Sequence, residues 1–244
     1  MPATETAAPA SEIIQDLVLA NRILYHQKVV DAFGHVSVRH DKHPARYLMS
    51  RYVPPGLVTS DDIVTFDLDS QPLDKTGLRY YSERFIHGEI YKIRPDVHAV
   101  VHCHAPQLIP FGATGYPLRP LYHMSAFLGS RGRGIPVFDI REAAGATDML
   151  IRTPELGAAL ALSLQEKPMV LMRGHGATMV GLSIKQVVFR SVYAVQNAAL
   201  QVEAIRLGEP VYLEGEEAVK AAESADRVVE RPWSLWRSEA LGER

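Results

Sequence analysis

The stretch Val97–His104, VHAVVHCH, decides the fold expected for this chain. Its valines and alanine form a β-rich apolar run, which is typical of a buried strand. Residues two apart in a strand point to the same side, so His102 and His104 share one face and Cys103 lies on the other. The stretch therefore predicts a buried strand that presents two imidazoles on one face.

Segments with strand and helix patterns alternate along the rest of the chain. We expect strands at 35–40, 46–50, 135–140, 168–173 and 177–180. We expect helices that begin at Ser11, Ser82, Thr153 and Ser183, and another over 216–229. This mixture predicts an α/β class with a mainly antiparallel sheet.

Length and composition favour one globular domain at residues 12–244, preceded by a disordered arm at 1–11. The net charge of -2 argues against a nucleic-acid partner. No apolar run reaches the roughly 18–20 residues that cross a bilayer, and the N-terminus lacks the features of a signal peptide. The single cysteine fits a reducing compartment, so we expect a cytoplasmic protein without a membrane partner.

His102 and His104 are candidate metal ligands. Two imidazoles on one face of a rigid strand suit a divalent ion such as zinc, and also manganese or cobalt. The alternative is a pair of partly buried histidines bonded to the backbone. His175 strengthens the metal hypothesis because it lies between Gly174 and Gly176, where backbone and ligand can come close. By itself it could equally be a turn histidine.

Glu83 is the acidic candidate for the same site. It follows Ser82 in the first turn of a predicted helix, and it could be a fourth ligand or a general base. A solvated acid at this position would also interact favourably with the helix dipole, and that explanation needs no metal. The residues alone leave both roles open.

Three stretches together resemble the class II aldolase/adducin family. They are GHVSVR at 34–39, the segment from Ser82-Glu83 through RPD at 94–96 to AVVHCH at 99–104, and RGHG at 173–176. The resemblance implies a three-layer α/β/α sandwich around a mainly antiparallel sheet, and a homotetramer with active sites between subunits. It also implies that His102, His104 and His175 bind a divalent metal, with Glu83 as ligand or acid/base.

The residues that cradle a phosphate in the family's sugar-phosphate aldolases are replaced here. Those enzymes usually have Gly-Asn, Thr-Gly and Ser-Ser where this chain has Gly34-His35, Ser50-Arg51 and Tyr81-Ser82. Small donors suit a phosphate, whereas an imidazole or an arginine fork suits a planar carboxylate. We therefore expect a small carboxylate substrate, bound by His35, Arg39, Ser50, Arg51 and Ser82. Arg39 could equally be a surface charge at a strand end.

A proton donor from a neighbouring subunit completes the site that the resemblance implies. The family's aldolases use a tyrosine there, and the matching position in this chain is His123, with Tyr122 adjacent. A histidine can donate a proton near neutral pH. His123 is therefore the expected catalytic partner of Glu83, and the one-residue offset leaves Tyr122 as the alternative.

Two local features resemble one branch of the family in particular. His35 after the glycine, and Met49-Ser50-Arg51 before a proline-rich segment, resemble dihydroxyphthalate and hydroxy-carboxymuconate semialdehyde decarboxylases. This implies a metal-dependent lyase that removes CO₂ from a hydroxylated aromatic acid or its ring-cleavage product, as in aromatic compound degradation. Zinc is preferred to manganese, cobalt or magnesium.

Two alternatives to the decarboxylase remain. One is a class II sugar-phosphate aldolase or epimerase, which the replaced phosphate cradle disfavours. The other is a non-catalytic, adducin-like scaffold protein, which is disfavoured because such relatives lack an intact metal set.

Overall fold

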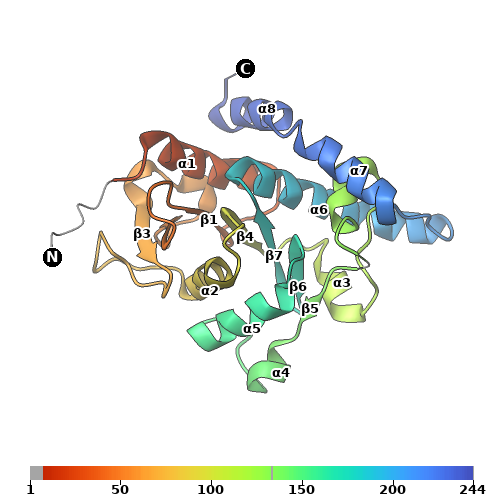
Figure 1. Ribbon diagram of the computed structural model, residues 1–244, viewed down its shortest axis with the longest axis horizontal. Helices are drawn as coiled ribbons and strands as arrows, with labels where there is room; N and C mark the ends of the chain where they lie inside the picture. The colour runs from red at the N-terminus through yellow and green to blue at the C-terminus, as the bar shows by residue number, and fades with distance from the viewer. Residues whose placement is uncertain (1–7, 133, 244) are drawn as a thin grey trace.

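A mixed sheet forms the centre of the computed structural model, which describes residues 8–132 and 134–243 (Figure 1). Within those residues the sheet has seven strands in the order β3-β2-β1-β4-β7-β6-β5. Neighbouring strands are antiparallel except β5 and β6, which are parallel. The mainly antiparallel sheet expected from the sequence is confirmed.

The strands are short and mostly buried. They are β1 His35–Arg39, β2 Arg46–Ser50, β3 Ile63–Asp67, β4 Ala99–Cys103, β5 Val137–Phe138, β6 Met169–Met172 and β7 Gly176–Gly181. The sequence prediction missed β3, which pairs with β2 at one edge of the sheet. β1 and β4 lie side by side near the centre, with His35 opposite His102.

Helices cover both faces of this sheet. They are α1 Ser11–His26, α2 Phe85–Ile93, α3 Ile109–Thr114, α4 Ile140–Ala144, α5 Pro154–Leu164, α6 Ile184–Leu207, α7 Gly215–Asp226 and α8 Glu230–Leu241. Short 3-10 turns occur at η1 Pro55–Leu57, η2 Ser60–Asp62, η3 Ser82–Arg84 and η4 His123–Leu128. Figure 1 shows α1, α6 and α8 above the sheet and α2 and α5 below it, so the three-layer α/β/α sandwich is confirmed.

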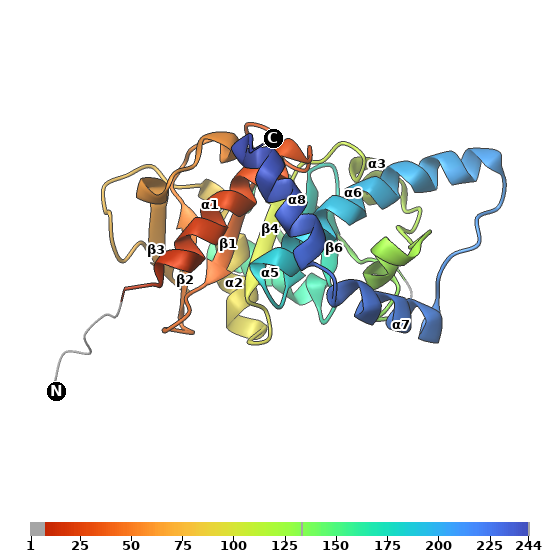
Figure 2. The ribbon, with the colours of Figure 1, turned by 90° about the horizontal axis from the view of Figure 1, so that it is seen from above.

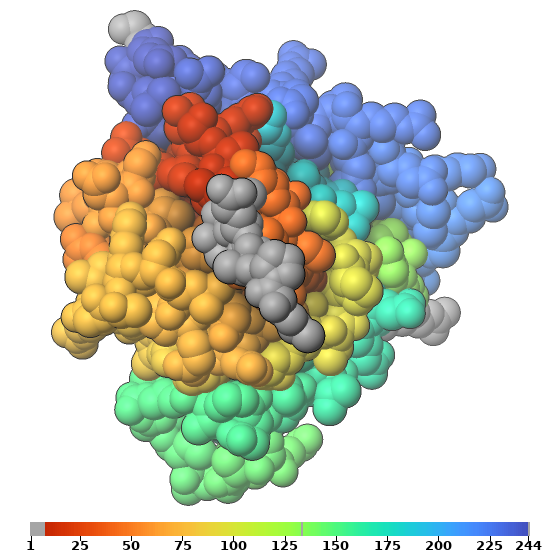
Figure 3. Space-filling model, turned by 60° about the vertical axis from the view of Figure 1, so that its left-hand side comes forward, coloured from red at the N-terminus to blue at the C-terminus, as the bar shows by residue number. Residues whose placement is uncertain are grey.

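Two apolar cores separate these layers. One core joins α1, α6 and α8 to the sheet and includes Leu17, Val187 and Trp236. The other joins α2 and α5 to the opposite face and includes Ile90 and Leu160. From above, α8 crosses over α1 and α6 (Figure 2). From the side, the segment around β2 and β3 forms a continuous orange surface next to the green surface of α4 and α5 (Figure 3).

The start of the fold differs from the prediction in two places. Ser11 is the first residue of α1 and does not cap it, because Ala10 holds the N-cap position. Part of the predicted arm is therefore ordered: Ala10 N–H donates to Asp41, whereas residues 1–7 lie outside the described residues. Ser82 likewise begins η3 without capping it.

Two predicted helix caps are confirmed. The side chain of Thr153 accepts the N–H of Leu156, and that of Ser183 accepts the N–H of Gln186. Each cap satisfies an N–H that has no partner inside the helix. In the described part of the chain, no helix is long and apolar enough to span a membrane.

Candidate metal centre and active site

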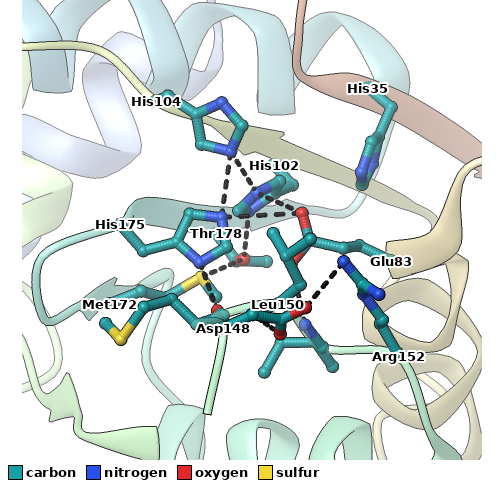
Figure 4. A network of polar contacts seen from close by, with 12 residues as sticks. His35, Glu83, His102, His104, Asp148, Leu150, Arg152, Met172, His175 and Thr178 are labelled. Carbon is teal, nitrogen blue, oxygen red and sulfur yellow. Dashed lines mark hydrogen bonds and ion pairs between the residues drawn. The ribbon is translucent and has the colours of Figure 1, made fainter.

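Three imidazoles and one carboxylate meet where β4 and β7 lie next to each other (Figure 4). The Nε2 atom of His104 lies 3.0 Å from Nε2 of His102 and 3.0 Å from Nε2 of His175. Glu83 Oε2 lies 3.6 Å from Nε2 of His102 and 3.5 Å from Nε2 of His175. The structure thus brings together all three predicted metal ligands and Glu83.

Glycine permits the close approach that seats His175. A Cβ atom on Gly176 would lie 2.0 Å from the carbonyl oxygen of Cys103, so only glycine fits where β7 begins beside β4. Gly174 has a φ of +64°, in the left-handed region that favours glycine. The turn around His175 therefore brings its side chain to the end of β4, through the close backbone approach that the flanking glycines predicted.

Strand alternation places the cysteine away from these ligands. Cys103 is fully buried in the core under α1 and α6, on the opposite face of β4 from His102. Burial raises the pKa of its thiol to about 11. Cys103 is a small apolar group in the core and is not positioned to ligate a metal bound by the histidines.

Second partners hold two of the imidazoles with Nε2 directed inward. His175 Nδ1 lies 2.9 Å from the carbonyl oxygen of Met149, so Nδ1 carries the proton and donates it there. His102 Nδ1 lies 3.3 Å from Thr178 Oγ1. Metal-ligating histidines are typically oriented in this way by a carbonyl or a hydroxyl at the other ring nitrogen.

The loop between α4 and α5, whose Met149 carbonyl orients His175, also holds Glu83. Its Oε1 accepts the N–H of Ile151 at 2.9 Å, which leaves Oε2 facing the imidazoles. The carboxylate is buried, with 6% of the residue exposed, and lies in η3 immediately before α2. The solvated, dipole-only role considered for Glu83 is therefore wrong.

These residues fit a divalent ion. Nitrogen ligands about 2.0–2.1 Å from a tetrahedral zinc ion would lie roughly 3.3 Å apart, close to the 3.0 Å observed between Nε2 atoms. Three nitrogen ligands and one carboxylate are also a common zinc donor set. His102, His104, His175 and Glu83 can thus hold a metal without rearrangement of the backbone.

The local pKa shifts favour neutral imidazoles at two of the three positions. Burial lowers the pKa of His102 well below its usual value, and the neighbouring rings lower it further. Burial and His175 also lower the pKa of His104, against the raising effect of Glu83. Burial lowers the pKa of His175, but Glu83 and the Met149 carbonyl outweigh it and leave this pKa raised.

His35 is a predicted substrate-binding residue that lies beside this cluster. Its ring centroid is 5.0 Å from that of His102 and 4.7 Å from that of Tyr81. Gly34 permits this position, because its φ is +93° and a Cβ there would meet the His102 carbonyl oxygen at 3.0 Å. Ser50 is also buried nearby, and its hydroxyl lowers the pKa of Tyr81 against the larger effect of burial.

The remaining predicted substrate-binding residues differ in position. Arg39 is buried, and its guanidinium donates to the carbonyls of Pro44, Tyr91, Arg94 and Val97. It holds loops together and does not face the cluster, so a substrate-binding role for Arg39 is not supported. Arg51 donates from Nε to Asp62 at 2.7 Å, and 41% of its side chain is exposed. Ser82 is exposed at the start of η3.

His123 lies elsewhere within a single chain. It is exposed at the first position of η4, and η4 contacts α6 and α7 on the other side of the fold. Tyr122 bonds Gln196 at 3.3 Å, and burial raises the pKa of its phenol to about 12. His123 is not part of the candidate metal centre of its own chain.

Two residues next to the site were missed by the sequence analysis. Tyr81 covers His35, and His87 bonds to it from α2. A signal for His87 was present, since Glu83, His87 and Tyr91 recur four residues apart and share one face where the chain is helical.

Sequence comparison identifies relatives with both decarboxylase and aldolase names. The sequence profile of the Class II Aldolase and Adducin N-terminal domain matches residues 15–202. A decarboxylase, tropJ of Talaromyces stipitatus, is 37% identical over 93% of this chain and 94% of its own length. The 3,4-dihydroxyphthalate decarboxylase of Arthrobacter keyseri is 29% identical over 83% of this chain and 82% of its own length.

Structural comparison agrees with the sequence. The L-fuculose 1-phosphate aldolase of Glaciozyma antarctica superposes with a TM-score of 0.77 and 20% identity, over 100% of this chain and 96% of that one. At that identity the likeness concerns the fold alone. Decarboxylases and aldolases both break carbon–carbon bonds, so these relatives support a lyase. The profile match and the similarity to tropJ show that the chain belongs to the class II aldolase and adducin family.

Proposed function

We propose that this chain is a metal-dependent decarboxylase of a hydroxylated aromatic acid or of its ring-cleavage product. One observation carries the proposal: three imidazole Nε2 atoms converge beside Glu83, in a chain 37% identical over nearly its whole length to a decarboxylase. We further propose zinc as the ion, with manganese, cobalt or magnesium as alternatives.

In this proposal His102, His104 and His175 hold the ion, and Glu83 lies beside it as the acid/base. When bound, it would supply a Lewis acid that draws electrons from the substrate as the C–C bond breaks. His35 and Arg51 provide donors for the substrate's oxygens, and the Tyr81 ring forms a wall beside His35. No role is assigned to Arg39. Ser50 and Ser82 remain proposed contacts of the substrate.

Proton balance assigns Glu83 its part. Loss of CO₂ leaves the bonding electron pair on the substrate carbon, and one proton must then be added there. Oε1 of Glu83 is occupied by the Ile151 N–H, so Oε2 is the oxygen available to carry that proton. Each turnover releases one CO₂ and takes up one proton, and in D₂O the product carbon should gain one deuterium.

The test is CO₂ release from a panel of dihydroxybenzoic, dihydroxyphthalic and hydroxymuconic acids with each of the four metals. We expect release from at least one acid, and a deuterium at the carbon that carried the carboxylate. Cleavage of a phosphorylated sugar without turnover of any acid would establish an aldolase instead. A metal-free protein without either activity would support the scaffold alternative.

We also propose that residues 12–244 act as one domain, in a cytoplasmic homotetramer whose sites lie between subunits. The exposed position of His123, away from the cluster of its own chain, supports its donation to a neighbouring site. Mixing inactive His123→Ala and His175→Ala chains tests this. If the sites are shared, hybrids should regain activity, because some sites combine the intact His175 of one chain with the intact His123 of the other. Hybrids that stay inactive would refute shared sites.

A further inference from the structure

A buried chain of hydrogen bonds runs from His35 into the core between β1 and α2. His35 Nδ1 lies 2.6 Å from His87 Nε2, and His87 Nδ1 lies 2.6 Å from Ser37 Oγ. Ser37 Oγ lies 2.8 Å from the Tyr91 hydroxyl, where the chain ends. At most 4% of any of these four residues is exposed.

Neither His35 nor His87 carries a charge in this chain of hydrogen bonds. No described carboxylate forms a hydrogen bond or ion pair with either ring, so a buried imidazolium here would be unpaired. Burial accordingly lowers the pKa of His87 to about 3. Each neutral ring then has one N–H donor and one bare acceptor nitrogen.

Two directions of donation are compatible with these distances. In the first, Tyr91 donates to Ser37, Ser37 donates to His87 Nδ1, and His87 Nε2–H donates to His35 Nδ1. In the second, every donation is reversed, and His35 carries its proton on Nδ1. Only the first places the remaining proton of His35 on Nε2.

The hydroxyl of Tyr91 decides between the two directions. Ser37 is its only hydrogen-bond partner among the residues that the structure describes. The second direction would therefore leave the Tyr91 O–H as a buried donor without an acceptor. The first direction pairs the donors of Tyr91, Ser37 and His87, and leaves only His35 Nε2–H, which is not among the fully buried, unpaired side-chain atoms of the described residues. The cost of one unpaired buried donor favours the first direction by about fivefold or more.

We propose that Tyr91, Ser37 and His87 hold His35 as its Nε2–H tautomer, so that His35 acts as a neutral hydrogen-bond donor to a substrate oxygen. Nε2 is free for this role, because it has no partner elsewhere in the described chain. His35 is then neither a further imidazole ligand nor a base. His87 is a positioning residue, and only the identity of the acceptor rests on the proposed function.

The direct test reads the tautomer without any substrate. Solid-state NMR of metal-loaded, ¹⁵N-histidine-labelled protein, with His35→Gln to assign the signals, should show a protonated Nε2 and a bare Nδ1 on His35. A protonated Nδ1 on His35 would overturn the proposal. This reading does not depend on whether the protein is a decarboxylase.

Two variants of His87 then test its positioning role. His87→Phe removes the donor to His35 and should mix the tautomers, with turnover of the acid lowered about 10- to 100-fold and metal content unchanged. His87→Gln can place an amide N–H near the former Nε2, and it should restore the tautomer and bring turnover within about threefold of wild type.

The outcomes separate this proposal from the decarboxylase proposal. If His87→Gln restores the tautomer but not turnover, His35 does not act as the proposed donor. If His87→Phe does not fold, the tautomer in wild type and in His87→Gln still decides. If no acid is turned over, the decarboxylase proposal fails while the tautomer assignment is tested independently.

Discussion

Two sets of histidines lie within a few ångströms of each other and serve different ends. In the first set, the Nε2 atoms of His102 and His175 lie 3.0 Å from that of His104, without a carbonyl or hydroxyl between them. In the second set, His35 and His87 bond to each other and continue into the hydroxyls of Ser37 and Tyr91.

The difference comes from what faces the other ring nitrogens. The Met149 carbonyl accepts the Nδ1–H of His175, so the bare Nε2 of this ring faces the other imidazoles. Thr178 Oγ1 lies next to Nδ1 of His102 in the same way. In the second set the hydrogen bonds run in series from Tyr91 through Ser37 and His87 to His35, and each of these bonds joins one donor to one acceptor. Converging lone pairs call for a cation, whereas a line of donors and acceptors needs none. The partners of a histidine, more than its burial, therefore decide its role.

The largest effect should follow removal of a ligand from the first set. We expect His175→Ala to lose its metal and to lower turnover by about a thousandfold or more, because the Lewis acid contributes several kcal/mol. His87→Gln serves as the matched control and should keep about one ion per chain. Elemental analysis of both proteins measures this. Stoichiometric metal in His175→Ala, or full activity after exhaustive chelation, would refute the assignment of the first set.

Glu83→Gln should have the next largest effect. The amide keeps the shape and can still accept the Ile151 N–H, but it cannot transfer the proton, so turnover should fall about 10²- to 10⁴-fold. Urea unfolding should change by about 1 kcal/mol or less. Wild-type turnover in Glu83→Gln would move the proton-transfer role elsewhere, with His123 the next candidate.

The second set should make the protein sensitive to acid. The pKa of His87 is lowered by burial from 6.5 to about 3, so below pH 6.5 the unfolded chain takes up a proton that the folded chain does not. Stability contributed by the neutral ring is therefore present above pH 6.5 and is lost as the pH falls toward 3. Between pH 7.5 and 5 this loss is about 2 kcal/mol.

His87→Gln removes that titrating group and leaves the other histidines in place. Urea unfolding of metal-free wild type and His87→Gln at both pH values measures the difference. The variant should lose about 2 kcal/mol less than wild type. Equal losses in the two proteins would show that His87 is charged, or exposed, in the folded state.

Cys103→Ala should have the smallest effect, although it lies between two ligands in sequence. Its thiol points into the opposite core, so we expect unchanged metal content and a stability loss of about 1 kcal/mol. His102→Ala, one residue away, is the contrasting variant. Metal loss from Cys103→Ala equal to that from His102→Ala would mean that the register of β4 is wrong.

Local rules in the sequence identified the first set as candidate ligands, and the family resemblance implied that they bind one metal. Strand alternation gave the shared face of His102 and His104, and glycines on both sides of His175 marked the close backbone approach that the structure shows. The mixture of strand and helix patterns predicted the mainly antiparallel sheet, and the family resemblance implied the three layers. The shared face of His102 and His104 and the turn at His175 depend on short spacings that a single sequence displays.

The second set depends on which elements lie against each other. His87 and Tyr91 recur along one face of α2, and His35 and Ser37 along one face of β1, but no spacing says that these two rows meet. The substrate-binding role predicted for Arg39 is not supported, again because of contacts with segments that are distant in sequence. The four carbonyl partners of Arg39 lie in α2 and in loops, 5–58 residues away in sequence, so its burial could not be read from its place at a strand end.

One loop between α4 and α5 orients two of the four residues of the candidate metal centre through its main chain alone. The carbonyl of Met149 orients His175, and the N–H of Ile151 holds Glu83. Met149 has a φ of +72°, a conformation that costs a non-glycine residue about 1–2 kcal/mol. Because peptide groups make both contacts, substitutions of the loop's side chains that keep its path should leave the orientation of His175 and Glu83 unchanged.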